Sequence, residues 1–278
     1  MPTIQALKKK LRGIRSTQKI AKAMKTASTV KFSRLNAVFA EYSRYSGAHR
    51  ELYERHRDEY NEYFAPVNKE APACLVIMTA NKGMCGSFNN EILNFATKLI
   101  ERSKSPYFII LCGKKAESYF TEKKIKFDKS FVFGDIPKYE EASSLFEYIW
   151  SALKDGKISS VKLAYPKYSN MMIQTPTLCE LFAFSDHEAI KKEEGLFFFP
   201  DKECVIKETA SNLMSAFIFE AILESALGAQ AATLMTMRSA YDTATEYTAQ
   251  LESEINRKRQ SQVTADVIET SAEHSQEN

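Results

Sequence analysis

The sequence predicts an α/β protein: a central Rossmann-like α/β domain plus long N- and C-terminal helices that pair as an antiparallel coiled coil. Apolar residues recur every three or four positions near both ends, and short apolar runs alternate with helical segments in the middle. Prolines stand at the borders between these regions. The predicted division is 1–66 for the N-terminal helix, 72–200 for the central domain and 205–270 for the C-terminal helix.

The N-terminal segment has a narrow apolar seam of Ile4, Leu7, Leu11 and Ile14, whose spacing places them on one side of a helix. The helical pattern continues to the proline at position 66. At about 1.5 Å per residue, such a helix would be roughly 90 Å long. A helix of that length is too long to pack inside a globule of 278 residues.

Residues 1–34 contain no Asp or Glu, so this helix is strongly basic although the net charge of the whole chain is only +3. Its charged residues are Lys8, Lys9, Lys10, Arg12, Arg15, Lys19, Lys22, Lys25, Lys31 and Arg34. Such an asymmetry indicates an acidic partner, which could be nucleic acid, anionic lipid or an acidic protein surface. An organelle transit peptide is a further interpretation, weakened because the helical pattern runs past any cleavage point.

The distribution of these charges favours a protein partner. Nucleic-acid binding would use basic residues along one face, whereas here they lie all round the helix. A membrane-surface helix would carry Trp or Phe on its apolar side, and the first thirty residues have neither. A helix sheathed by an acidic protein cavity fits best.

The C-terminal segment 229–278 has neither Gly nor Pro, so nothing in it forces a helix to break. Its seam of small and apolar residues has no obvious partner in the central domain. The two terminal helices can most simply bury their seams against each other. Because one opens the chain and the other closes it, they would pair antiparallel.

The central region alternates strand and helix, which indicates a small parallel sheet. The predicted strands are 73–79, 107–112 and 131–133, and the predicted helices are 89–102, 114–123 and 141–153. Later strands are predicted at 159–165, 171–184 and 196–199, as an antiparallel edge.

No motif for catalysis, for a metal or for a cofactor is convincing. The five cysteines show no C-x-x-C pair and the four histidines no zinc pattern, which is typical of reduced thiols in a cytosolic-type compartment. No apolar run approaches the roughly 18–20 residues of a membrane span, and the N-terminus lacks the apolar core of a secretory signal.

One loop, 80–89, lies between a predicted strand and helix, where phosphate-binding loops usually lie. Its sequence ANKGMCGSFN matches neither the P-loop nor the dinucleotide pattern, so a tight strand-to-helix turn is the preferred interpretation. Cys85, near the start of that helix, could act as a nucleophile. Without a legible His partner, a packed thiol is the better interpretation.

Several stretches, in order along the chain, resemble the gamma subunit of F-type ATP synthases. Residues 14–25 (IRSTQKIAKAMK) resemble that family's "TQKI-x-KAM" helix, and residues 82–89 resemble its "RGLCGGFN" loop. Residues 256–264 (NRKRQSQVT) are similar to "NRARQAAIT", and Glu224, Ser225, Met235 and Met237 to its "ES…RM-x-AM" pattern. The chain departs from the family pattern at Leu234, Thr243, Asp266, Glu273 and His274.

The resemblance implies a non-catalytic rotor shaft without a cofactor. Its partners would be three alpha and three beta subunits, the epsilon subunit and the c-ring, with no nucleic acid and with membrane association only through the complex. It would lie at the cytoplasmic face of the bacterial inner membrane as a peripheral protein and couple proton flow to ATP synthesis. The residues implied to contact beta subunits are Met24, Lys25, Arg259 and Gln260.

Three other functions compete with this interpretation: a shaft in an assembly that only hydrolyses ATP, a nucleic-acid-binding module and an enzyme that depends on Cys85. The direction of ATP turnover, the coupling ion (H⁺ or Na⁺) and the regulation are not legible in the sequence.

Overall fold

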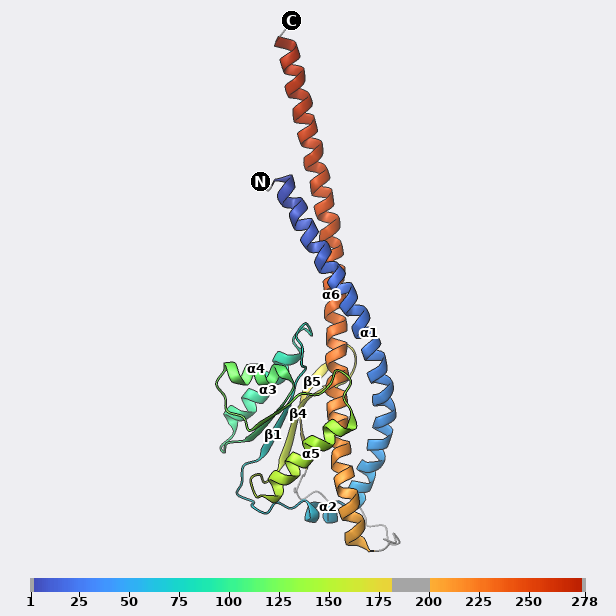
Figure 1. The fold of residues 1–278 in the computed structure, drawn as a ribbon, viewed down its shortest axis with the longest axis vertical. Coiled ribbons are helices and arrows are strands. Elements are labelled where there is room, and N and C mark those ends of the chain that lie inside the picture. The colour runs from blue at the N-terminus through green and yellow to red at the C-terminus, as the bar shows by residue number, and fades with distance from the viewer. Residues whose placement is uncertain (1–2, 182–200, 277–278) are drawn as a thin grey trace. The chain divides into compact units, whose positions relative to one another are not determined.

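A computed structural model describes residues 3–181 and 201–276. The chain divides into two compact units. The helical unit consists of Met1–Ala27 and Leu234–Asn278, and the α/β unit consists of Ser28–Thr233. Two long helices contribute to both units: α1 (Ile4–Arg55) and α6 (Lys202–Gln276) (Figure 1).

The α/β unit contains a five-stranded sheet with the order β3-β2-β1-β4-β5. Its strands are β1 (Cys74–Met78), β2 (Phe108–Cys112), β3 (Lys129–Phe131), β4 (Val161–Tyr168) and β5 (Gln174–Glu180). Strands β1 to β4 pair in parallel, and β5 pairs antiparallel to β4 at the edge. The predicted parallel sheet with an antiparallel edge is therefore confirmed.

Strand β1 is buried on both faces because its side chains alternate between two apolar layers. Leu75 and Ile77 pack against α3 (Phe88–Arg102) and α4 (Lys114–Glu122). Val76 and Met78 belong to the larger core, which includes α5 (Tyr139–Lys154) and parts of α1 and α6. Figure 1 shows α3 and α4 on one side of the sheet and α5 on the other, beside α6.

The predicted elements differ from the structure mainly at their ends. The third strand lies two residues earlier than predicted, where it pairs with β2 as Ile110↔Lys129 and Cys112↔Phe131. The predicted strand 171–184 begins only at Gln174, because Asn170 Oδ1 accepts the backbone N–H groups of Met172 and Ile173 in a turn. The predicted strand 196–199 lies outside the described residues.

The N-terminal helix does not continue to residue 66 as predicted. It ends at Arg55, because the backbone of His56 leaves the helical region (φ −122°, ψ 32°), and α2 (Arg57–Tyr63) follows. The break turns Tyr60 and Phe64 fully into the core, where Phe64 packs edge-on against Trp150 of α5. The aromatic residues that extend the helical pattern beyond Arg55 therefore pack into the sheet domain.

Helix α6 begins with a cap, since Asp201 Oδ1 accepts the backbone N–H of Cys204 at 2.8 Å. Contrary to the expectation from sequence, α6 contains an eighteen-residue window that is apolar enough to cross a membrane by length and composition. Of this window, 78% is buried inside the structure, as in a core helix of a globular protein.

Candidate functional site

The helical unit is an antiparallel helix pair, as three contacts between α1 and α6 demonstrate. Arg15 forms an ion pair with Glu252 at 2.5 Å. Gln18 Nε2 donates to Thr245 Oγ1 at 2.8 Å. The Lys25 ammonium lies 5.3 Å from the centre of the Tyr241 ring. As residue numbers rise along α1, their partners' numbers fall along α6.

The apolar seam predicted for the N-terminal helix packs against α6 at the start of α1. Leu7, Leu11 and Leu251 form a buried cluster, with Ile14 and Ile255 packed against it. The cluster is small and isolated from the sheet core, so it stabilises only this end of the helix pair. Beyond Ile255, the residues of α6 whose side chains are described, up to residue 268, are half or fully exposed.

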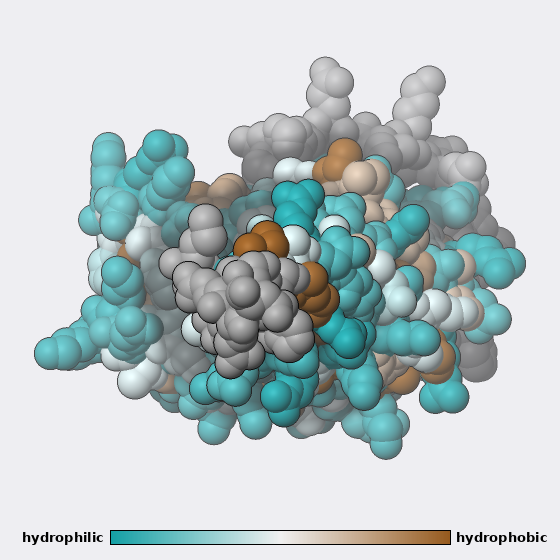
Figure 2. Space-filling view, turned by 90° about the horizontal axis from the view of Figure 1, so that it is seen from above, coloured by the Kyte–Doolittle hydropathy of each residue, from teal (hydrophilic) through white to brown (hydrophobic). Residues whose placement is uncertain are grey.

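The basic residues of α1 in the helical unit leave a positively charged surface. Six of them are exposed and have no acidic partner within residues 3–181 and 201–276. They are Lys8, Lys9, Lys10, Arg12, Lys19 and Lys22. In the view of Figure 2 the surface is mostly hydrophilic, with hydrophobic side chains in small separate areas. The positive charge of these six residues can attract an acidic partner through long-range electrostatics.

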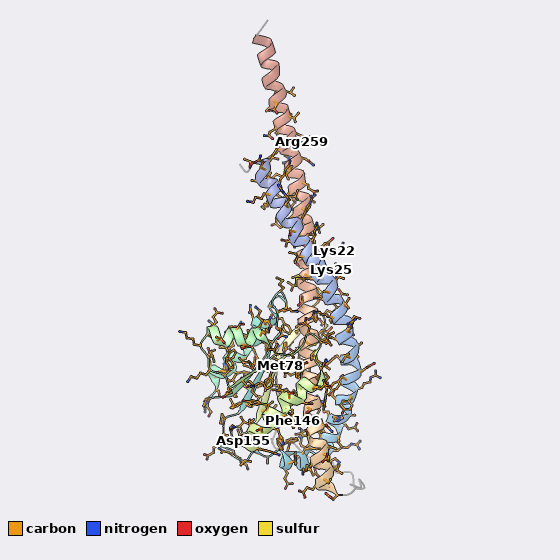
Figure 3. The ribbon with its side chains drawn as sticks, viewed as in Figure 1. Lys22, Lys25, Met78, Phe146, Asp155 and Arg259 are labelled. Carbon is orange, nitrogen blue, oxygen red and sulfur yellow. The ribbon has the colours of Figure 1, made fainter. Side chains whose placement is uncertain are left out.

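The four predicted contact residues lie on two separate surfaces. Met24 and Lys25 are half-buried in the helix pair, whereas Arg259 and Gln260 are exposed on α6. Because Lys25 lies opposite Tyr241, Arg259 is eighteen residues further along α6, or roughly 27 Å at the helical rise. Figure 3 shows Lys22 and Lys25 close together on α1 and Arg259 nearer the C-terminus of α6. Any partner that contacts both surfaces must therefore extend along the helix pair or use more than one subunit.

The loop 80–89 forms a tight strand-to-helix turn, held together by its own side chains. Asn89 Oδ1 accepts the backbone N–H of Ala80 at 2.9 Å, and Asn89 Nδ2 donates to the carbonyl oxygen of Lys82 at 3.2 Å. Two residues with positive φ, Met84 (64°) and Gly86 (60°), make the reversal possible. The side chain of Asn89 thus occupies the backbone N–H of Ala80, a donor that a bound phosphate could otherwise use.

Cys85 is a packed thiol, as the sequence favours. Its side chain is buried and clusters with Phe88 and Ala229. Burial raises the pKa of the Cys85 thiol, although a hydrogen bond from Asn89 acts in the opposite direction. A raised pKa disfavours the thiolate, which is the nucleophilic form.

The crevice between the carboxyl ends of β1 and β4, where the strand order reverses, is where doubly wound folds usually bind ligands. Here α6 approaches it closely. A Cβ atom added to Gly228 would lie 3.1 Å from carbon atoms of both Phe88, which follows the β1 loop, and Gln174, which begins β5. The absence of a side chain at Gly228 therefore lets the α6 backbone pack against this edge of the sheet.

The described residues contain a further cavity, of about 350 Å³, between α1, α6 and the β4–β5 edge. Four of the charged residues in its walls form ion pairs, Arg50 with Glu220 at 3.1 Å and Arg57 with Glu54 at 3.2 Å. Within residues 3–181 and 201–276, no group of three or more His, Cys, Asp or Glu side chains could hold a metal ion. The site with the clearest functional surface is therefore the helix pair.

Sequence reasoning missed two polar contacts that join the sheet to the long helices. Glu224 on α6 is only 7% exposed, and its Oε1 accepts the backbone N–H of Tyr168 at 2.9 Å. Asp135, in the segment between β3 and α5, contacts Lys31 of α1 and Lys82 of the loop after β1. Asp135 gives no local signal in the sequence, since its partners lie 104 and 53 residues away.

Comparison with known proteins gives one consistent result. The family model described as ATP synthase matches residues 3–272. The ATP synthase gamma chain of Desulforudis audaxviator is 27% identical, over 97% of both chains. That of Mycoplasmopsis synoviae is 28% identical, over 97% of both chains.

Solved structures show a similar fold. The rotor of the Euglena gracilis mitochondrial ATP synthase includes a chain with a TM-score of 0.66 and 18% identity, and the match covers 94% of this chain and 98% of that one. A chain of the Tetrahymena thermophila mitochondrial ATP synthase central stalk and c-ring has a TM-score of 0.63 and 20% identity, with 80% and 99% covered.

Proposed function

The chain belongs to the ATP synthase gamma chain family and acts as the central shaft of that assembly, and from this premise we propose that it transmits torque without catalysing any step of ATP chemistry itself. The observation that carries the proposal is the family match over residues 3–272, which includes both long helices. The paired helices give the stiffness that a shaft requires. The six exposed cations of α1 that have no acidic partner among the described residues give it a surface that can bind acidic partner loops.

Torque transmission requires that the shaft bind the conformations of its partners unequally. A shaft with identical affinity for every state of a partner cannot shift the populations of those states. The helix pair meets this requirement because its faces differ: the α1 face carries exposed lysines, and the side chains of α6 from residue 256 to residue 268 are half or fully exposed. As the shaft turns, each catalytic partner would meet a different face in turn.

The partners that this function requires are three alpha and three beta subunits around the helices, with the epsilon subunit and the c-ring at the α/β unit. In this proposal the chain is a peripheral protein at the cytoplasmic face of the bacterial inner membrane. It associates with the membrane only through the complex, and it binds neither a cofactor nor nucleic acid.

We assign partner contacts to Met24, Lys25, Arg259 and Gln260. Arg259 and Gln260 support this role through their exposure, and Lys25 through its position in the helix pair, where its ammonium already lies over Tyr241. Lys25 would therefore present its charge to a partner at a position fixed by the Tyr241 ring.

Arg259→Ala tests the proposal in a reconstituted complex. We expect the rate of ATP synthesis to fall by roughly five- to tenfold, at the low end of a typical coupling free energy, while the complex still assembles. Lys207→Ala, which removes another exposed cation of α6, is the matched control and should leave the rate unchanged. Equal synthesis rates for Arg259→Ala and the wild type would rule out the assigned contact.

A further inference from the structure

Asp135 joins three separate segments of the α/β unit through one carboxylate oxygen. Its Oδ2 accepts hydrogen bonds from Lys31 of α1 and from Lys82 of the loop after β1, the latter at 2.8 Å. Asp135 itself lies in segment 132–138, which connects β3 to α5. The side chain of Asp135 is 26% exposed and that of Lys31 is 36% exposed, whereas that of Lys82 is 74% exposed. The contact with α1 is therefore the better shielded of the two.

Segment 132–138 is itself held firmly against the sheet domain. Both carboxylate oxygens of Glu141, in the first turn of α5, accept backbone N–H groups of this segment, from Gly134 at 2.9 Å and from Lys138 at 2.7 Å. The side chain of Asn81 donates to the carbonyl oxygen of Phe133 at 2.6 Å. Asp135 thus projects from a fixed support, so a force on α1 at Lys31 is transmitted to α5 and to the loop after β1.

The two lysines depend on the same negative charge. Because each ammonium nitrogen lies within 2.8 Å of one oxygen, the nitrogens of Lys31 and Lys82 are no more than about 5.6 Å apart. At that separation like charges repel each other unless an anion lies between them. Removing the charge of Asp135 would therefore break both contacts together, and the exposed Lys82 would move into solvent.

We propose that Asp135 is a positioning residue that fastens the α/β sheet to α1, so that torque applied to the sheet domain reaches the long helix without slippage. This inference rests on the proposed shaft function. It identifies the Asp135 contact as the place where torque passes from the sheet domain to α1. The neighbouring Phe32, whose ring centre lies 6.3 Å from that of Tyr168 in β4, supplies apolar contact at the same place. The buried Leu35 of α1 packs in the core of this unit, and the charge-assisted hydrogen bonds of Asp135 add a directional contact to that packing.

The test uses the assembled complex in vesicles and measures the number of coupling ions, H⁺ or Na⁺, pumped per ATP hydrolysed. Asp135→Asn keeps the size of the side chain and removes its charge. We expect it to lower this ratio by roughly two- to fivefold, the equilibrium effect of losing a pair of this kind. Lys31→Met should lower the ratio nearly as much, and Lys82→Met less, because Lys82 is more exposed. Asp135→Glu, which keeps the negative charge, should retain most of the wild-type pumping ratio.

The matched control is Asp155→Asn, which removes a local pair with Lys157 at 2.9 Å at the C-terminal end of α5 (Figure 3). It should leave the pumping ratio unchanged. Hydrogen exchange in the complex gives a second readout, because the helical amides of α1 around Lys31, residues 28–35, should exchange faster in Asp135→Asn and not in Asp155→Asn. Exchange and pumping ratio both equal to wild type would overturn the proposal, as would a loss of pumping that merely follows a lower melting temperature.

Failure of the proposed function would look different. If the complex with the wild-type chain pumped neither H⁺ nor Na⁺ on ATP hydrolysis, the shaft role would be wrong. Faster exchange at amides 28–35 in Asp135→Asn would still demonstrate that Asp135 fastens α1 to the sheet domain.

Discussion

Replacing Leu251 by Ala should release the start of α1 from the helix pair. Leu251 is 5% exposed and is the α6 member of the small cluster with Leu7 and Leu11. Truncating a buried Leu usually costs 2–5 kcal/mol, and we expect about 2 kcal/mol here because a small, open cluster can relax around the gap. A neighbouring ion pair, Arg15–Glu252, cannot compensate, because it is about half exposed and such pairs contribute below about 1 kcal/mol.

Native-state hydrogen exchange measures this effect directly, because the helix end can open without unfolding the sheet. A loss of about 2 kcal/mol corresponds to roughly thirtyfold faster exchange of the amides of residues 7–14. Amides of β1 and β2 should not change. The control is Val263→Ala on the same helix, because Val263 is 54% exposed and should affect neither region. Equal protection of residues 7–14 in Leu251→Ala and in the wild type would refute the antiparallel register that places Leu251 against Leu7 and Leu11.

Two further substitutions test the α/β unit by urea unfolding. Gly113→Ala should lower the free energy of unfolding by about 3 kcal/mol or more. Gly113 has φ +104°, and an added Cβ would lie 2.3 Å from the carbonyl oxygen of Thr79. The control Gly13→Ala, where an added Cβ on α1 has nothing within 4 Å, should not lower the free energy of unfolding. Burial raises the pKa of Glu224 above its ordinary value of 4.5, so the folded state favours the protonated acid. The stability that the protonated Glu224 contributes is therefore lost as the pH rises. Glu224→Gln should therefore be relatively more stable at pH 8 than at pH 4 compared with the wild type, and the opposite trend would contradict this assignment.

Much of the architecture could be predicted from the sequence because it rests on local patterns. The strands β1 and β2 are continuous apolar runs, since both faces are buried, and the helices between the strands have their own apolar periodicity. The seam of Ile4, Leu7, Leu11 and Ile14 indicates a paired helix, and its partner in the structure is α6.

What the sequence could not predict depends on residues that are distant along the chain. The end of α1 at Arg55 follows from a better tertiary site for Tyr60 and Phe64, because both aromatic side chains become fully buried only after the helix turns. Residues 52–64 otherwise continue a helical pattern, so tertiary packing overrides local preference there. Asp135 looks like an ordinary loop acid, and only the fold brings Lys31 and Lys82 to it.

The position of Gly228 explains how a doubly wound sheet can serve a mechanical role. In such sheets the crevice at the reversal of strand order is usually left open for a ligand. Here the α6 backbone at Gly228 packs on Phe88 and Gln174 at that edge, and Ala229 contacts Cys85 and Phe88. On the other side of the same loop, Lys82 and Asp135 connect it to α1. Both long helices thus contact the sheet domain at its carboxyl edge, α6 through Gly228 and Ala229 and α1 through Lys31.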